Sequence, residues 1–173
     1  KTDAGNYSMG LKTADFENTS ENFKNVEFVV NDGSLTISKR NVTLTSATDS
    51  KVYDGNALTN SEVTVGGDGF ATNEGATYKV TGTQTNVGKS ANTFSYTLNS
   101  NTKLTNYNIT KTEGELEVTA VTNKVTVTIT GHTAEAKYDG QEHTAEGYDV
   151  STSNALYTAA DFKFTGTDSV TKT

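Results

Sequence analysis

A short motif that occurs twice sets the strongest limit on how this chain can fold. The stretch 51–55 reads Lys-Val-Tyr-Asp-Gly and the stretch 136–140 reads Ala-Lys-Tyr-Asp-Gly, so Tyr53 and Tyr138 lie 85 positions apart (138 − 53 = 85). Each copy precedes small polar residues and then a strand-like run. In a chain of 173 residues, a period of this length indicates two related small domains.

The amino-acid usage favours β structure. Threonine, valine, asparagine and glycine are abundant, whereas proline, cysteine and tryptophan are absent. β-Branched residues favour strands, and Asn-Gly, Asp-Gly and Gly-Gly steps favour the tight turns between strands. We therefore predict an all-β (mainly β) chain of tandem small domains, either β-sandwich or β-grasp-like, in an elongated array.

Alternation of apolar and polar residues predicts the individual strands. The predicted strands are 6–11, 26–30, 34–38, 42–45, 62–65, 77–82, 93–98, 106–110, 115–119, 124–129, 148–150 and 162–167. The Asn-Asp-Gly turn at 31–33 predicts a hairpin of 26–30 with 34–38, because Asp-Gly supplies the positive φ that hairpin turns need. Thr158 and Asp161 have the spacing that starts a helical turn.

The repeat divides the chain into three parts. The adjacent basic pair Lys39-Arg40 separates residues 1–39 from a complete B-type repeat at 40–120, and residues 121–173 repeat the first half of that unit. Residues 1–39 in turn match its second half. We therefore predict one complete repeat, flanked by the C-terminal half (1–39) and the N-terminal half (121–173) of an A-type repeat.

Three matches support the assignment of the first part. Thr2-Asp3-Ala4-Gly5 matches Thr85-Asn86-Val87-Gly88, Asn22-Phe23 matches Asn106-Tyr107, and residues 33–37 match 114–118. Lys172-Thr173 also repeats Lys1-Thr2, as expected of one period cut out of a longer alternating array. We expect the chain to begin in mid-pattern, without a signal peptide.

Charge and hydropathy argue against several classes of partner. A net charge of −7 disfavours nucleic acid and anionic membrane surfaces, because phosphate groups attract lysine and arginine clusters that this chain lacks. No apolar run approaches the roughly 18 residues of a membrane span. We expect no nucleic-acid partner and no membrane insertion.

The sequence also lacks the patterns that catalysis and metal binding require. Without cysteine, neither disulfides nor thiolate metal sites form, and no nucleophile elbow, phosphate loop or dinucleotide motif is present. His132, His143 and the single carboxylate of the turn at 66–69 fall short of a zinc or calcium ligand set. We predict no enzyme activity, no catalytic or metal-binding residues and no cofactor.

The Tyr-Asp-Gly motif has two interpretations, one functional and one architectural. Its residues are Tyr53, Asp54 and Gly55 in one copy and Tyr138, Asp139 and Gly140 in the other. In the functional interpretation, each domain displays the motif as a ligand loop. In the architectural one, which we favour, the tyrosine packs on the core, the aspartate bonds to nearby backbone amides and the glycine adopts positive φ.

A chain without cysteine has another way to form a covalent cross-link. A lysine and an asparagine can join in an isopeptide bond, since a buried lysine loses its charge readily. Lys51 with Asn106 or Asn108 is the candidate pair. The alternative is that Lys51 is an ordinary exposed lysine, and the intact mass distinguishes the two because each bond removes one ammonia.

A family resemblance covers essentially the whole chain. The chain resembles the tandem MBG and YDG-type repeats of bacterial cell-surface proteins in the strings KVYDGNALT, TGTQTNVGKSANTF, NYNITKTEGELEVTA and TDAGNYSMGL. These pieces follow the family's order, from Tyr-Asp-Gly through Asn-Tyr-x-Ile to Gly-x-Leu-x-Val. The resemblance implies an extracellular protein attached to the cell surface or wall, with repeated β domains often described as adhesive or mucin-binding.

Three functions remain open from the sequence. The leading hypothesis is a structural repeat of an adhesin-like protein, a stalk that spaces a binding tip from the cell, with neighbouring repeats as partners. The second is an extracellular fibre subunit whose half-domains complement one another head-to-tail, which gives open filaments. The third is a module that binds a host glycoprotein, mucin or glycan through exposed aromatic residues.

Overall fold

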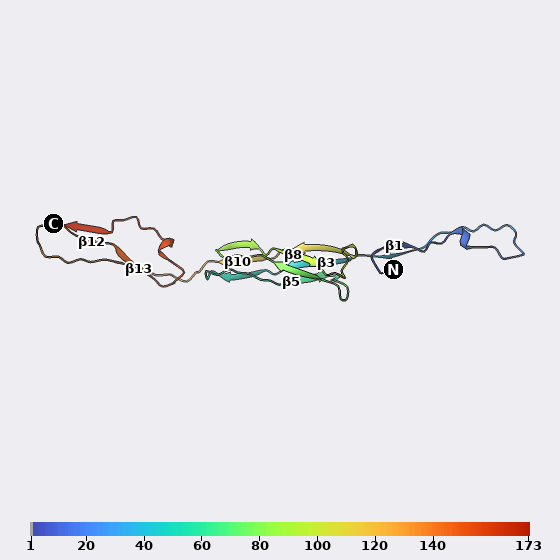
Figure 1. The fold of residues 1–173 in the computed structure, drawn as a ribbon, viewed down its shortest axis with the longest axis horizontal. Coiled ribbons are helices and arrows are strands. Elements are labelled where there is room, and N and C mark those ends of the chain that lie inside the picture. The colour runs from blue at the N-terminus through green and yellow to red at the C-terminus, as the bar shows by residue number, and fades with distance from the viewer. Residues whose placement is uncertain (1) are drawn as a thin grey trace. The chain divides into compact units, whose positions relative to one another are not determined.

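The computed structural model describes residues 2–173, which form a mainly β protein as predicted (Figure 1). Its strands are β1 (Gly5–Ser8), β2 (Ser34–Ile37), β3 (Arg40–Ser46), β4 (Asp49–Val52), β5 (Val63–Gly67), β6 (Ala76–Val80), β7 (Gly88–Ala91), β8 (Phe94–Leu98), β9 (Tyr107–Thr112), β10 (Glu115–Thr119), β11 (Val127–Gly131), β12 (His143–Glu146), β13 (Tyr148–Thr152) and β14 (Ser169–Lys172). The helical elements are three 3₁₀ turns, η1 (Thr13–Asp15), η2 (Leu104–Asn106) and η3 (Ala159–Asp161). None of these turns in residues 2–173 has the length or apolar character needed to cross a membrane.

The chain forms two compact units. The first comprises the chain up to Lys51 together with Ala57–Val118, and the second comprises Val52–Asn56 together with Thr119–Thr173. We call residues 2–39 the N-terminal segment, residues 40–120 the central segment and residues 121–173 the C-terminal segment. The first unit therefore contains the N-terminal segment and nearly all of the central segment.

The central segment holds the buried core, because its strands carry core-facing side chains at alternate positions. On β3, Val42, Leu44 and Ser46 are buried while the residues between them are half-buried. β3 pairs antiparallel with β5 and parallel with β9, and β6 pairs with β8. Val42 and Leu44 cluster with Phe94 of β8 and Tyr107 of β9. Leu58, Leu116 and Val118 are also buried.

A buried polar node joins the end of β3 to the start of β10. The Ser46 hydroxyl donates to the Asn92 carbonyl oxygen at 2.6 Å and accepts from the Gly114 N–H at 3.0 Å. The Asn92 side-chain amide donates to the carbonyl oxygens of Ala47 and Asn60, each at 2.9 Å. Because Ser46 ends β3 and Gly114 directly precedes β10, the two strands follow one another along the domain.

The C-terminal segment reproduces a strand pairing of the central segment. β11 pairs with β13 in the antiparallel register Val127↔Thr152, and β3 pairs with β5 in the register Val42↔Gly67. Both strands are displaced by the period of the sequence motif (127 − 42 = 85 and 152 − 67 = 85). β12 and β14 form a second antiparallel pair in this segment.

The N-terminal segment reproduces a different pairing. β1 pairs with β2 in the antiparallel register Gly5↔Ile37, and β7 pairs with β10 in the register Gly88↔Val118. These are the positions that the sequence match aligns, Gly5 with Gly88 and Ile37 with Val118. The two terminal segments thus carry pairings that belong to opposite halves of the central segment.

Two predicted strands do not form, and the predicted hairpin is wrong. Residues 26–30 and 162–167 are not in strands, and β2 pairs with β1 in place of 26–30. The Asp32 carboxylate accepts hydrogen bonds from the Ser8 hydroxyl at 2.5 Å and from the Leu11 N–H at 3.0 Å. Both stretches lack a partner strand. Their counterparts in the central segment are β9 and β6, which pair with β3 and β8 respectively. The residues that match β3 and β8 lie in the other terminal segment in each case.

Candidate functional site

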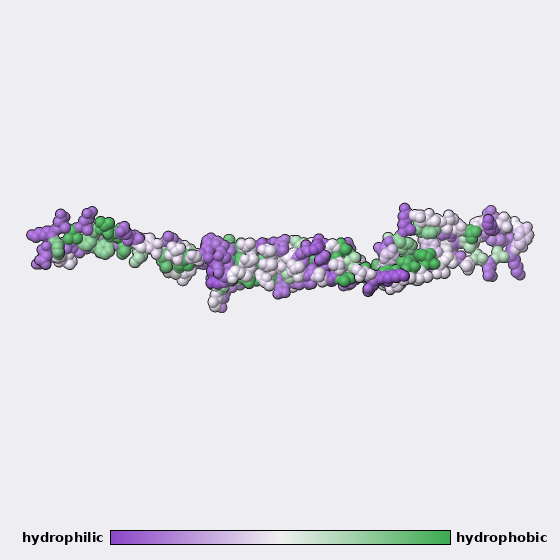
Figure 2. Space-filling view, turned by 180° about the vertical axis from the view of Figure 1, so that it is seen from behind, coloured by the Kyte–Doolittle hydropathy of each residue, from purple (hydrophilic) through white to green (hydrophobic). Residues whose placement is uncertain are grey.

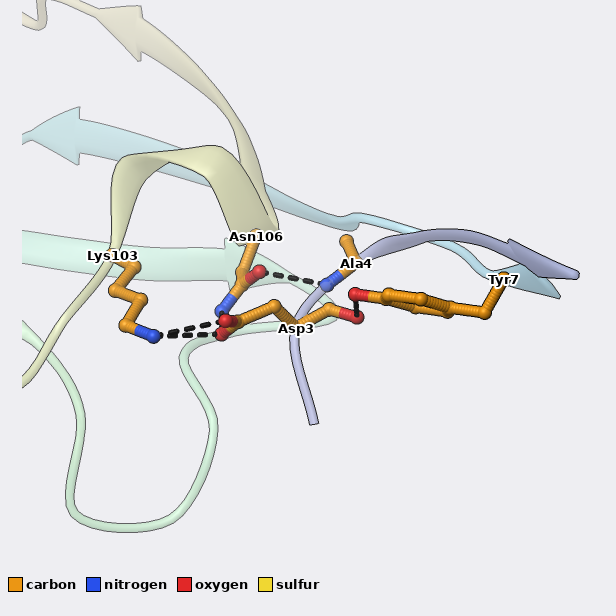
Figure 3. A network of polar contacts seen from close by, with 5 residues as sticks. All are labelled: Asp3, Ala4, Tyr7, Lys103 and Asn106. Carbon is orange, nitrogen blue, oxygen red and sulfur yellow. Dashed lines mark hydrogen bonds and ion pairs between the residues drawn. The ribbon is translucent and has the colours of Figure 1, made fainter. Parts of the chain in front are cut away.

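The N-terminal segment and the central segment meet at a network of polar contacts that we call the clasp (Figure 3). Its residues are Asp3, Ala4, Tyr7, Lys103 and Asn106. The Lys103 ammonium lies 2.9 Å from Oδ2 and 3.2 Å from Oδ1 of Asp3. Asn106 donates from Nδ2 to Asp3 Oδ1 at 3.1 Å and accepts at Oδ1 from the Ala4 N–H at 2.8 Å. The clasp thus joins residues 100 to 103 positions apart in the sequence.

Local structure places each side chain of the clasp. Lys103 precedes η2 and Asn106 ends it, immediately before β9. On the opposite side, Gly5 begins β1 with a φ of 156°, at the edge of the region that favours glycine. The Tyr7 side chain lies beside Gly5, and its hydroxyl donates to the Asp3 carbonyl oxygen at 2.8 Å. The Asp3 backbone is therefore held by Tyr7 while its carboxylate faces Lys103.

Charge in the clasp is open to water. The side chains of Lys103 and Asp3 are both exposed. Hydrogen bonds from Lys103 and then from Asn106 lower the pKa of Asp3, and the hydrogen bond with Asp3 raises the pKa of Lys103. Water screens exposed ion pairs, so they contribute little to stability. The clasp therefore orients two neighbouring segments more than it stabilises either of them.

Tyr107, the residue after Asn106, connects the clasp with the core. Its hydroxyl donates to Glu74 Oε2 at 2.5 Å and accepts from the Ala71 N–H at 3.0 Å. Its buried ring packs edge-on against Phe70, with 5.2 Å between the ring centroids. Burial, followed by the hydrogen bond to Glu74, raises the pKa of Tyr107. The packed ring fixes the backbone that carries Asn106.

The two Tyr-Asp-Gly motifs share a backbone conformation. In both copies the aspartate Oδ1, of Asp54 or Asp139, accepts a hydrogen bond at 2.9 Å from the N–H two positions later. The glycines have positive φ, 80° at Gly55 and 74° at Gly140. An aspartate that bonds its own turn and a glycine in the left-handed region form a tight turn.

The two tyrosines differ, and the expectation that each packs on a core is wrong for Tyr138. Tyr53 is half-buried, and its N–H donates to the Thr119 carbonyl oxygen at 2.9 Å. Tyr138 is 90% exposed. Thr119 belongs to β10, and the residues that the sequence match aligns with β10 are those of β2 in the N-terminal segment.

The candidate isopeptide residues lie in different sheets. Lys51 is on β4 in the sheet β4-β10-β7, whereas Asn108 is on β9 in the sheet β5-β3-β9 and Asn106 ends η2, immediately before β9. The Asn106 side chain belongs to the clasp, and Asn108 Nδ2 donates to Asn41 Oδ1 at 3.0 Å. The structure thus places Lys51 in a different sheet from Asn108 and places Asn106 in the clasp.

His132 and His143 each contact one aspartate in the C-terminal segment. His132 Nε2 lies 3.3 Å from Asp149 Oδ1, and His143 Nε2 lies 2.9 Å from Asp139 Oδ1. The hydrogen bond with Asp149, followed by that with the Glu146 carbonyl oxygen, raises the pKa of His132. Across residues 2–173, no three His, Cys, Asp or Glu side chains are placed together to hold a metal ion.

Sequence reasoning did not identify the clasp. The sequence gives Asn106 a role in a candidate isopeptide bond and in the repeat match, and it gives Asp3 and Lys103 no role in a contact between segments. The available signal was the repeat itself, because Asp3 occupies the position that Asn86 holds in the other copy. A carboxylate that only one of two matched loops carries points to a contact made by that loop alone.

Comparison of the chain with protein-family profiles, curated protein sequences and solved structures gave no match. The resemblance to MBG and YDG-type repeats therefore stays a prediction.

Proposed function

We propose that the chain is a structural repeat of a stalk, which spaces a binding tip from the surface of a bacterial cell. Its partners are then neighbouring repeats of the same protein, and its location is the extracellular cell surface or cell wall. The observation that carries the proposal is the clasp. A stalk transmits direction from one domain to the next only where the junction between them resists bending, since small domain interfaces otherwise permit relative motion.

The short connection between the segments supports the same proposal. β2 ends at Ile37 and β3 begins at Arg40, so Ser38 and Lys39 alone connect the two strands. The Arg40 guanidinium donates to the carbonyl oxygen of Gly69 at 2.9 Å and also to that of Asp68. A connection of two residues, held at Arg40 and braced by the clasp, leaves the N-terminal segment little freedom to rotate.

Backbone ¹⁵N relaxation on the full chain tests the proposal, because it gives a rotational correlation time for each segment. In the wild type we expect the N-terminal and central segments to report the same value. The double variant Lys103→Ala/Asn106→Ala should shorten the correlation time of the N-terminal segment alone. Lys79→Ala, an exposed lysine on β6, is the matched control and should change nothing. An N-terminal segment that tumbles independently in the wild type would remove the stalk proposal.

A further inference from the structure

We infer that the C-terminal segment of one copy binds the N-terminal segment of a second copy, and that together they complete a domain of the same design as the central segment. This inference rests on the repeat organisation proposed above and names the partner. Three features of the two terminal segments support the inference: their strand pairings, their exposed apolar side chains and their attachment points.

Strand pairs that lie within one half of the central segment recur in the terminal segments. β3 with β5 belongs to the first half and recurs as β11 with β13, and β7 with β10 belongs to the second half and recurs as β1 with β2. A hydrogen bond beside the second pair recurs as well. The Asn92 N–H donates to the Gly114 carbonyl oxygen, and the Met9 N–H donates to the Gly33 carbonyl oxygen, each at 2.8 Å.

Strand pairs that join the two halves do not recur. In the central segment β9 of the second half pairs with β3 of the first, and β8 pairs with β6. The corresponding residues are 23–30 and 11–15 in the N-terminal segment and 160–164 in the C-terminal segment, and none of them is in a strand. In the part of the chain that the structure describes, β11 pairs with β13 alone, whereas its counterpart β3 has two neighbours. The missing pairs are those whose two strands lie in different terminal segments.

The apolar side chains that would fill the shared core are exposed. In the central segment, Leu44, Phe94, Tyr107 and Leu116 are between 0% and 4% exposed. Their counterparts in the terminal segments are Ile129 at 50%, Leu11 at 39%, Phe23 at 67% and Leu35 at 53%. Figure 2 shows hydrophobic surface gathered on each terminal segment. Apolar patches of this kind mark interaction sites, and here each patch carries the positions that the other lacks.

The alignment fixes a contact across the new interface. Val80 of β6 lies opposite Phe94 of β8 in the central segment. The matching positions are Phe164 in the C-terminal segment and Leu11 in the N-terminal segment, and both side chains are exposed. Leu11 of one copy therefore packs against Phe164 of the other.

A second copy supplies the partner because the two points at which the terminal segments attach to the central segment, the start of β3 and the end of β10, lie at opposite ends of that segment. β3 begins beside Tyr107 and runs to Ser46. There the buried polar node connects it to the start of β10, which continues along the segment and ends at Thr119. Figure 1 shows β3 and β10 toward opposite ends of the central segment. Head-to-tail contacts between such copies give a ring where the rotation between copies closes and an open chain of copies where it does not.

Association includes local refolding. Residues 13–15 form η1, in which the Lys12 N–H donates to Asp15 Oδ2 at 2.8 Å, yet their counterparts lie in β8. The turn must open before these residues pair as a strand, and ordering residues 23–30 and 160–164 costs conformational entropy. Binding is therefore weaker than the exposed apolar area alone suggests, and it depends on concentration.

Sedimentation equilibrium of the full chain from micromolar to millimolar concentration tests the association. We expect the average mass to rise with concentration above that of the monomer. Ile129→Asp and Leu35→Asp should each reduce the mass toward the monomer, because each places a charge in the shared core. Val65→Asp, at an exposed position on β5 of the central segment, is the matched control and should associate as the wild type does. A wild-type chain that stays monomeric throughout, or core variants that associate normally, would overturn the inference.

Disulfide trapping tests the register. Lys79 and Ser95 lie opposite one another in the β6–β8 pair, and the matching positions are Lys163 and Lys12. The chain has no cysteine, so Lys163→Cys and Lys12→Cys each carry a single thiol. With oxidised glutathione as oxidant, a mixture of the two variants should give a disulfide-linked dimer, with the glutathione reduced, whereas neither variant alone should. Lys12→Cys mixed with Lys79→Cys is the control, and its cross-linking at an equal rate would contradict the proposed register.

The two proposals fail in different experiments. If the chain stays monomeric while relaxation shows a rigid clasp, the association is wrong and the stalk stands. If copies associate while the N-terminal segment of each tumbles freely against its own central segment, the stalk is wrong.

Discussion

Gly114 lies so close to Ala47 that no side chain fits between them: a Cβ on the glycine would stand 2.5 Å from the Ala47 carbonyl carbon. The neighbouring Ser46 carbonyl oxygen would be equally near, at 2.5 Å. All of these neighbours are backbone atoms, which cannot move aside as a flexible side chain can. The close approach allows the Gly114 N–H to reach the Ser46 hydroxyl and lets β10 follow β3.

Gly114→Ala should therefore destabilise the first compact unit by about 2 kcal/mol or more, because the backbone must shift to admit the methyl group. Urea unfolding measures the change. Gly66→Ala is the matched control, since its Cβ would meet neighbours at 3.8 Å and 3.9 Å, which is ordinary contact. That variant should stay within about 1 kcal/mol of the wild type. Equal stability of the two variants would contradict the packing argument.

Asn92→Ala should cost about 2–3 kcal/mol, because it leaves the carbonyl oxygens of Ala47 and Asn60 without their side-chain donor. The buried position of Asn92 keeps water from replacing that donor. Asn101→Ala is the control, since Asn101 makes one exposed hydrogen bond, to the Asn73 carbonyl oxygen. We expect it to cost about 0.5 kcal/mol. Urea unfolding midpoints of the two variants should differ clearly, and similar midpoints would show that the node is dispensable.

The clasp should weaken in acid. The pKa of Asp3 is lowered in the folded chain by hydrogen bonds from Lys103 and Asn106, so its contribution is complete above about pH 4 and is lost as the pH falls through the lower folded value. The amide signal of Ala4, which donates to Asn106, should report this titration in NMR spectra. Asp3→Asn should abolish the transition. A midpoint at or above the ordinary aspartate value would rule out the Lys103 contact in solution.

The β11–β13 hairpin should respond to pH in the opposite direction. The pKa of His132 is raised by its hydrogen bonds with Asp149 and the Glu146 carbonyl oxygen, so the stabilisation is complete below about pH 6.5 and is lost as the pH rises through the higher folded value. An NMR titration of the His132 ring measures the midpoint. Asp149→Asn should move it down toward about 6.5. An unchanged midpoint in that variant would exclude Asp149 as the main cause.

Local sequence patterns predicted most of the elements. Alternation of Val42 and Leu44 with threonine marked β3, and the Thr158 to Asp161 spacing marked η3, in which the Thr158 hydroxyl accepts from the Ala160 N–H at 3.4 Å. Such signals lie within a few neighbouring residues, so the local sequence contains all the information that the element needs. The repeat likewise predicted which residues correspond, and the strand registers agree with that alignment.

The candidate site was not predicted in this way. The clasp joins Asp3 to Lys103 and Asn106, and no local pattern specifies which residues will meet across such a distance in sequence. The buried node was missed for the same reason, because Ser46 and Asn92 have the composition of surface residues and are buried only where β3, β7 and β10 converge. Burial of a polar side chain depends on its partners, which come from elsewhere in the chain.

The sequence by itself determined that this chain is mainly β and where most of its strands lie, since side-chain alternation acts over a few residues. Only the tertiary structure decided that residues 26–30 and 162–167 stay out of strands, because a strand exists only where a second one offers it hydrogen bonds.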